Sequence, residues 1–259
     1  MKWDPAKYVQ FGDYRDRPYF DLTARIHADA PRHVVDLGCG PGNLTATLAG
    51  RWPTAEVTGL DSSAEMLAQS GGHADQFANL SFSQADIAGW MPSRDTDVVV
   101  TNAALQWVPG HRDMLARWLA ALRPGAWFAL QVPGNFNSPS HTLMRGLAES
   151  GSWAGRLAGV LRHEDVGGGP DDYLNIMLDA GCDADAWETT YSQLLPGPNP
   201  VLEWVRGTGL RPVLAALSAA DARAFEAQYS ALLAEAYPAG PHGTVFPFRR
   251  IFAVARKRE

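Results

Sequence analysis

Three glycines follow an acidic residue in the stretch HVVDLGCGPGN. Asp36, Gly38, Gly40 and Gly42 form the pattern D-x-G-x-G-x-G between an apolar run and a segment with helical spacing. Glycine has no Cβ, so such a turn lets a ligand approach backbone N–H groups at the start of a helix. The plainer alternative is a tight strand-to-helix turn. The dinucleotide fingerprint G-x-G-x-x-G is absent, because Asn43 stands where its third glycine would fall.

Polar residues also end the next three apolar runs. Asp61 ends the second run, where a carboxylate can accept hydrogen bonds from both hydroxyls of a ribose. Asp86 ends the third run, where it can accept from an adenine amine while Ile87 packs on the ring, and Asn102 ends the fourth. Taken singly, each acid could be a helix cap or a solvated turn. Four strand ends in succession favour a nucleoside site.

The elements that must position these residues follow from the hydrophobic pattern. Apolar runs alternate with helix-length segments, which predicts βαβ units on a parallel sheet with strands at 33–38, 55–61, 79–86, 96–102 and 126–132. The unbroken VVV at 98–100 is typical of a strand buried on both faces. Two more strands are expected at 186–196 and 244–257, and helices at 140–160, at 170–181 and in the insertion that separates the last two strands.

We expect a single domain over 1–259, with a cofactor-binding core at 33–132. The segments 136–168 and 197–243 are expected to form a helical lid or substrate insertions, and 1–30 a helical segment over the site. An insertion between the last two strands would overhang the carboxyl edge of the sheet, where open α/β sheets bind ligands.

Composition limits the function classes. The chain has 259 residues, 46% hydrophobic and 19% charged, with a net charge of -6, so a general nucleic-acid binder is not expected. Its two cysteines, Cys39 and Cys182, suggest neither a disulfide framework nor a metal clip. No signal peptide and no apolar run of about 20 residues is found, so we expect a cytoplasmic protein without membrane partners or a metal. The oligomeric state stays open.

The core resembles the class I S-adenosylmethionine-dependent methyltransferases. DLGCGPG is similar to their first motif, GLDSS to the second-strand acid, ADI to the adenine contact, and LRPGAWFAL to the turn into the fifth strand. The resemblance covers about 33–132. It implies a Rossmann-like α/β fold with a seven-stranded, mostly parallel sheet, helices on both faces, and an antiparallel last strand inserted between the fifth and sixth.

The resemblance also implies S-adenosylmethionine as the cofactor and assigns residues to its parts. The methionine moiety would lie against Asp36, Gly38, Gly40 and Gly42. The ribose would contact Asp61 and Ser62, the adenine Asp86 and Ile87, and the region of the sulfonium Asn102.

Along nearly the whole chain, the sequence is similar to the carboxylate O-methyltransferases that act on trans-aconitate. The similarity lies in WDPAKYVQFGDYRDRP, NAALQWVPGH, SHTLMR, WVRGTGLRP and FRRIFAVARK, whereas the glycine-rich HEDVGGGPDDY departs from it. It implies transfer of a methyl group to a tricarboxylate, giving a monomethyl ester. Another small acid or a hydroxyl acceptor, or a nucleotide-binding module without activity, remain alternatives.

A carboxylate acceptor changes which residues are needed. A carboxylic acid with a pKa near ~4 is already ionised at neutral pH, so we expect in-line attack without a general base and no catalytic side chain beyond positioning. Arginine binds carboxylates through two parallel hydrogen bonds, although any single arginine could instead be a solvated surface residue. The candidates for substrate binding are Arg17, Trp107, Arg145, Arg206, Arg211 and Arg250. Of these, Arg145 and Arg211 are favoured.

Overall fold

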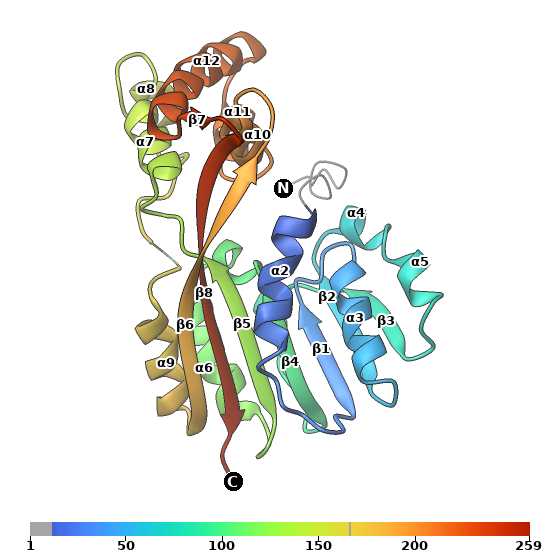
Figure 1. Ribbon diagram of the computed structural model, residues 1–259. Helices are drawn as coiled ribbons and strands as arrows, with labels where there is room; N and C mark the ends of the chain where they lie inside the picture. Colours follow the sequence, from blue (N-terminus) through green and yellow to red (C-terminus); the bar gives the residue numbers. More distant parts are fainter. Residues whose placement is uncertain (1–11, 166) are drawn as a thin grey trace. The chain divides into compact units, whose positions relative to one another are not determined.

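The computed structural model describes residues 12–165 and 167–259, in which one mixed sheet has the strand order β3-β2-β1-β4-β5-β8-β6 (Figure 1). The strands β3, β2, β1, β4 and β5 pair in parallel, and the arrow of β8 points against those of its neighbours in Figure 1. The strands are β1 (His33–Leu37), β2 (Glu56–Asp61), β3 (Leu80–Gln84), β4 (Thr96–Asn102), β5 (Trp127–Pro133), β6 (Cys182–Leu195), β7 (Ala239–Gly240) and β8 (Gly243–Lys257).

This architecture confirms the expected Rossmann-like fold, with one difference in the strand count. The sheet has eight strands where seven were expected, because the two-residue β7 forms an antiparallel pair with the start of β8. A strand of this length carries no periodicity that a sequence pattern could detect.

The helices occupy the segments between the strands. In chain order they are α2 (Gly12–Thr23), α3 (Asn43–Arg51), α4 (Ala64–Leu67), α5 (Gly71–Ala74), η1 (Ile87–Gly89), η2 (Leu105–Trp107), α6 (His111–Ala121), α7 (Pro139–Ala148), α8 (Ala154–Leu157), α9 (Pro170–Asp179), α10 (Pro200–Arg206), α11 (Arg211–Ala216) and α12 (Ala219–Ala236). The prediction of a single helix over 140–160 is wrong. The segment forms two helices, α7 and α8, and a turn that contains serine and glycine, residues of low helix propensity, separates them.

The chain divides into two compact units. The first contains the described residues up to Val132 together with Gly168–Glu188 and Ile251–Glu259, and the second contains Pro133–Gly167 and Thr189–Arg250. Both predicted insertions fall almost wholly within the second unit. That they act as a lid stays a prediction, and the first eleven residues of the expected N-terminal segment lie outside the described part.

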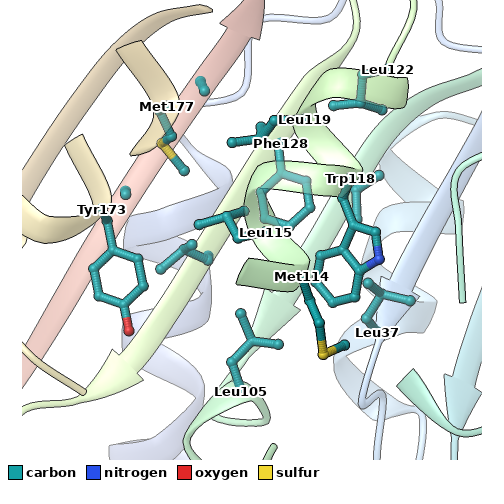
Figure 2. Close-up of a cluster of buried hydrophobic side chains, with 14 of the residues drawn as sticks. Leu37, Leu105, Met114, Leu115, Trp118, Leu119, Leu122, Phe128, Tyr173 and Met177 are labelled. Atoms are coloured by element: carbon teal, nitrogen blue, oxygen red, sulfur yellow. The ribbon is translucent and has the colours of Figure 1, made fainter. Parts of the chain in front are cut away.

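The main core of the first unit lies where α6 and α9 cover one face of the sheet. Figure 2 shows Leu115, Trp118 and Leu119 of α6 packed towards Phe128 of β5, with Tyr173 from α9 beside them. All but the last residue of β4 is buried, as the VVV run predicted. Burial on both faces makes this strand a rigid support for whatever follows its carboxyl end.

The opposite face of the first unit carries α2 and α3. The side chains of Leu22 and Ile26 are fully buried there, and Arg51 of α3 donates to the carbonyl oxygens of Thr23 at 2.6 Å and of Ile26 at 2.5 Å. Helices therefore cover both faces of the sheet, as the fold class requires.

The second unit has its own core, built around α7 and α12. The Tyr229 hydroxyl donates to the Ser140 carbonyl oxygen, and the Ser140 N–H donates to the Tyr237 hydroxyl at 3.0 Å. Ser218 caps α12 by accepting a hydrogen bond from the Asp221 N–H at 3.2 Å. The helical character expected for both insertions is confirmed.

Candidate functional site

At the carboxyl edge of the first unit's sheet, five residues on adjacent strands lie side by side in register and form a row. Asp61 pairs with Gln84 of β3, and Asn102 pairs with Gln131 of β5. The register of β1 with β2 and β4 places the residue after Leu37 level with both Asp61 and Asn102. Residues in register on adjacent strands share a face of the sheet. The row across β3, β2, β1, β4 and β5 is therefore Gln84, Asp61, Gly38, Asn102 and Gln131.

The glycine loop occupies the middle of this row, and packing fixes two of its glycines. Gly38 and Gly42 have φ of +78° and +86°, and a Cβ would lie 2.3 Å from the Ala104 Cβ at the first and 2.5 Å from the Phe82 ring at the second. Around Gly40, by contrast, no described heavy atom lies within 4 Å of where a Cβ would be. The loop therefore packs tightly at both ends and borders open space at its centre, where a ligand can meet the backbone.

The ring of Phe82 packs against the glycine loop, a contact that the sequence did not predict. Phe82 is the register partner of Gly59 in β2, and its ring would lie 2.6 Å from a Cβ on Gly59 as well as against Gly42. Two glycines from different elements thus make the space for one ring. A phenylalanine on a neighbouring strand gives no local signal of this contact.

Asp61 holds the loop in place. Its Oδ2 accepts a hydrogen bond from the Gly40 N–H at 2.9 Å, and its Oδ1 accepts from the Ser63 N–H at 2.8 Å. The carboxylate is partly exposed, and each oxygen retains a further acceptor site. Ser62, which lies between Asp61 and Ser63 in the sequence, is exposed. The arrangement leaves Asp61 able to accept from a ligand's hydroxyls.

Asp36 lies beneath the loop and is 3% exposed. Its Oδ2 accepts a hydrogen bond from the Thr45 hydroxyl of α3 at 2.6 Å. Burial, reinforced by the nearby Asp61 charge, raises the pKa of Asp36 to about 7, although the Thr45 hydrogen bond opposes the shift. A carboxyl group so placed changes its charge near neutral pH, next to the candidate ligand site.

Asp86 is placed differently from the expectation, because β3 ends two residues earlier at Gln84. Its carboxylate accepts from the Ala88 N–H at 2.9 Å and so caps the short helix η1. Ile87 is buried, with its Cδ1 3.5 Å from the position of a Cβ on Gly38. Asp86 is exposed, and a capping carboxylate keeps further acceptor capacity.

The end of β4 carries backbone strain beside Asn102. Ala103 has φ of +53°, a conformation that costs a non-glycine residue about 1–2 kcal/mol. Two hydrogen bonds hold it there: its N–H donates to the Gln131 carbonyl oxygen at 2.9 Å, and its carbonyl accepts from the Gln106 side chain at 2.6 Å. Strain of this kind is concentrated at functional sites.

These features test which ligand the residues fit. The backbone around Gly40 is open, the carboxylates of Asp61 and Asp86 are accessible acceptors, and the buried Asn102 Oδ1 makes no hydrogen bond to any described residue. Acceptors predominate, so the site suits a ligand that brings hydroxyl or amine donors or positive charge. A nucleoside with a cationic group meets these requirements. Among the described residues, no group of three or more histidine, cysteine or acidic side chains could hold a metal ion.

The six substrate-binding candidates fall in different units. Arg17 and Trp107 belong to the first unit, where Arg17 is exposed and lies 3.9 Å from Asp21. The others belong to the second unit. Arg145 stacks over Phe136 at 3.9 Å, and the buried Arg250 stacks over Phe248 at 4.3 Å.

The remaining two arginines of the second unit differ in their surroundings. Arg206 is bound by two carboxylates, those of Glu203 and Glu226, which makes it the weakest candidate. Arg211 begins α11 and is partly exposed. Substrate binding by any of the six stays a prediction.

Comparisons with known proteins agree with this geometry. A family model described as "Methyltransferase domain" matches residues 34–125, which contain the glycine loop, Asp61, Asp86 and Asn102. The structure resembles the YcgJ protein of Bacillus subtilis with a TM-score of 0.59 at 15% identity, covering 95% of this chain and 99% of that one. It also resembles phosphoethanolamine N-methyltransferase 2 of Haemonchus contortus, solved with S-adenosyl-L-methionine, with a TM-score of 0.55 at 17% identity, covering 94% of this chain and 53% of that one.

Fold and site together define a class I methyltransferase, with the glycine loop and the acid that ends β2 at the carboxyl edge of a 3-2-1-4-5 sheet. Curated relatives narrow the class further. The chain is 55% identical to trans-aconitate 2-methyltransferase of Streptomyces avermitilis, covering 98% of this chain and 97% of the relative. It is 54% identical to the enzyme of that name from Rhodococcus jostii, covering 98% and 99%. The chain belongs to the trans-aconitate 2-methyltransferase family.

In the described part of the chain, no helix combines the length and the apolar character needed to cross a membrane.

Proposed function

We propose that this enzyme transfers the methyl group of S-adenosylmethionine to a carboxylate of trans-aconitate, giving a monomethyl ester. The observation that carries the proposal is the row at the carboxyl edge, where Asp61 holds an open glycine loop beside the buried, unsatisfied oxygen of Asn102. The substrate is supported by relatives of that name that match almost the whole length of the chain, the second unit included. We also propose a cytoplasmic location, with a small free acid as the partner.

The described residues that would hold the cofactor follow the row. Asp61 and Ser62 would bind the ribose, and Asp86 with Ile87 the adenine, since these residues lie at the β2 and β3 end. Asp36, Gly38, Gly40 and Gly42 would hold the methionine moiety at β1, and Asn102 would face the sulfonium at β4. When bound, S-adenosylmethionine supplies an activated methyl group on a positively charged sulfur.

The protein's part in the reaction is positioning. A carboxylate is ionised at neutral pH, so its oxygen can form the new bond to carbon as the sulfur–carbon bond breaks, and no proton has to move. The chain must hold that oxygen in line with the methyl group at about 3 Å and keep water away. This explains why the site needs no base at the carboxyl edge.

Arginines are proposed to recognise the remaining carboxylates. Arg145, Arg211 and Arg250 of the second unit are the main candidates, because a guanidinium can bind a carboxylate through two parallel hydrogen bonds. Arg206, Arg17 and Trp107 are secondary candidates. A tricarboxylate would need two or three such partners.

A methyl-transfer assay with labelled cofactor tests the proposal. Trans-aconitate, cis-aconitate, isocitrate, citrate and a simple phenol would be compared as acceptors, and we expect a monoester from trans-aconitate. Transfer to the phenol alone, or to none of the acids, would refute the proposed substrate. Arg145→Ala and Arg211→Ala should raise the KM for the acid about tenfold or more without changing cofactor affinity. Arg223→Ala, an exposed arginine on α12, is the matched control.

A further inference from the structure

One buried polar side chain of the first unit has no assigned role. Gln131 of β5 is 1% exposed, and neither its Nε2 nor its Oε1 makes a hydrogen bond to any described residue. Its register partner Asn102 has an equally unsatisfied Oδ1. A buried amide left without partners costs about 1–3 kcal/mol, and the surrounding strand, WFALQVP, is otherwise apolar. A leucine at position 131 would avoid that cost.

The face on which Gln131 lies connects it with the candidate site. Asn102 and Gln131 share a face with Asp36, since side chains alternate along a strand and the registers run through Val100. The neighbouring Thr101 pairs with Leu130, a member of the core on the opposite face. Gln131 therefore belongs to the row at the carboxyl edge and not to the core under α6 and α9.

The position of Gln131 within the row indicates what it would bind. Adjacent strands are about 4.8 Å apart, so Gln131 on β5 lies about 14 Å along the row from Asp61 on β2, with Gly38 and Asn102 between them. The nucleoside is assigned to the β2 and β3 end. The β5 end is then left for the acceptor that meets the methyl group.

We propose that Gln131 binds the carboxylate that is methylated, its Nε2 donating a hydrogen bond to the oxygen that does not react. This inference rests on the proposed function. A neutral amide suits the task, because it fixes the direction of the carboxylate without the strong charge pairing by which a guanidinium would weaken the attacking oxygen. The Asn102 amide, its neighbour in register, can donate to Gln131 Oε1 in the same arrangement.

The proposal predicts an unusual combination of effects for Gln131→Leu. Removing an amide that has no partner should leave the melting temperature of the ligand-free protein unchanged or raise it. The KM for trans-aconitate should rise about 10- to 100-fold, the loss expected for one hydrogen bond to a charged group. Binding of S-adenosylmethionine and S-adenosylhomocysteine, measured by calorimetry, should change less than about twofold. Gln131→Glu should bind the acid still more weakly, because it opposes two negative charges.

Thr101→Val provides the matched control. Thr101 is also fully buried, and its hydroxyl also makes no hydrogen bond to a described residue, but it faces the core. This variant should leave the KM for the acid unchanged. Calorimetric titration of trans-aconitate into the complex with S-adenosylhomocysteine adds a readout that does not depend on turnover.

Three results would overturn the inference. They are an unchanged acid affinity in Gln131→Leu, an equal loss of cofactor affinity, and a large fall in melting temperature without an effect on KM, which would indicate a structural water at this position. If Gln131→Leu does not fold, Gln131→Glu and the shorter Gln131→Asn decide by the same comparison. Wild-type protein that binds the acid but makes no ester refutes the proposed function while the binding comparison still decides on Gln131. No acid binding to the wild type refutes both.

Discussion

Replacing Asp36 by asparagine should stabilise the ligand-free protein, and by an amount that grows with pH. The carboxyl group is 3% exposed, and burial with the nearby Asp61 charge raises its pKa from 3.8 to about 7. Between these values the folded state holds a proton that the unfolded state has lost, so the free energy of unfolding falls as pH rises from about 4 to about 7. Asparagine keeps the shape and can still accept from Thr45, but it does not ionise.

The expected size follows from the shift. At 1.36 kcal/mol per pKa unit, a shift of about three units corresponds to ~4 kcal/mol once the group is ionised in both states, at about pH 8. At pH 5 the same relation gives less than ~2 kcal/mol, so the stability gap between variant and wild type should widen by about 3 kcal/mol between pH 5 and pH 8.

Urea denaturation at several pH values measures this gap, with Asp75→Asn as a control for the loss of a charge at an exposed position. A gap that does not change with pH would show that Asp36 is not held at a raised pKa, and the argument from burial would be wrong. In the same variant we expect weaker binding of the positively charged cofactor. Greater stability with poorer binding would explain why the chain keeps a buried acid there.

Three further predictions use matched features of the chain. Gly42→Ala should lower the stability of the ligand-free protein far more than Gly40→Ala, because both positions have a positive φ but only the former drives a Cβ into the Phe82 ring, and equal losses in denaturation would contradict the packing argument. Burial, with the nearby Arg145 charge, lowers the pKa of His141 from 6.5 to about 4, so the free energy of unfolding should fall as pH drops from about 6.5 to about 4. His141→Gln should remove that dependence in the same denaturation series, and a slope that survives the substitution would refute it. Asp97→Ala should destabilise the protein by about 1.5–3 kcal/mol, because it removes the buried carboxylate that the partly exposed Arg32 and Arg123 both contact, and a loss below about 0.5 kcal/mol in urea denaturation would count against this interaction.

Local patterns in the sequence were enough for much of the fold. Three predicted elements each depend on residues a few positions apart: the strand β1, the glycine turn and the helix from Asn43. The helical insertion before the last strand is confirmed by α12, whose Phe225, Tyr229 and Leu233 are buried. Propensity and periodicity act over this range, which is why these predictions are confirmed.

Features that depend on register between distant strands were not predictable in the same way. Gln131 becomes part of the site only because β5 pairs with β4 so that it lies beside Asn102. A single polar residue in an apolar strand was the available signal. Arg206 is paired with Glu226, twenty positions further along the chain, which no local pattern indicates. The positions of the arginines towards a substrate are likewise a matter of tertiary structure.

The space shared by Gly42, Gly59 and Phe82 has a consequence for how this sequence can vary. Gly59 makes no contact with any proposed ligand. Its substitution should nevertheless be tolerated poorly, because the Phe82 ring occupies the space that a Cβ would need both at Gly59 and at Gly42. Mutational scanning should therefore accept a larger residue at position 59 only in a background where position 82 has become small, whereas position 42 should stay glycine because of its φ of +86°.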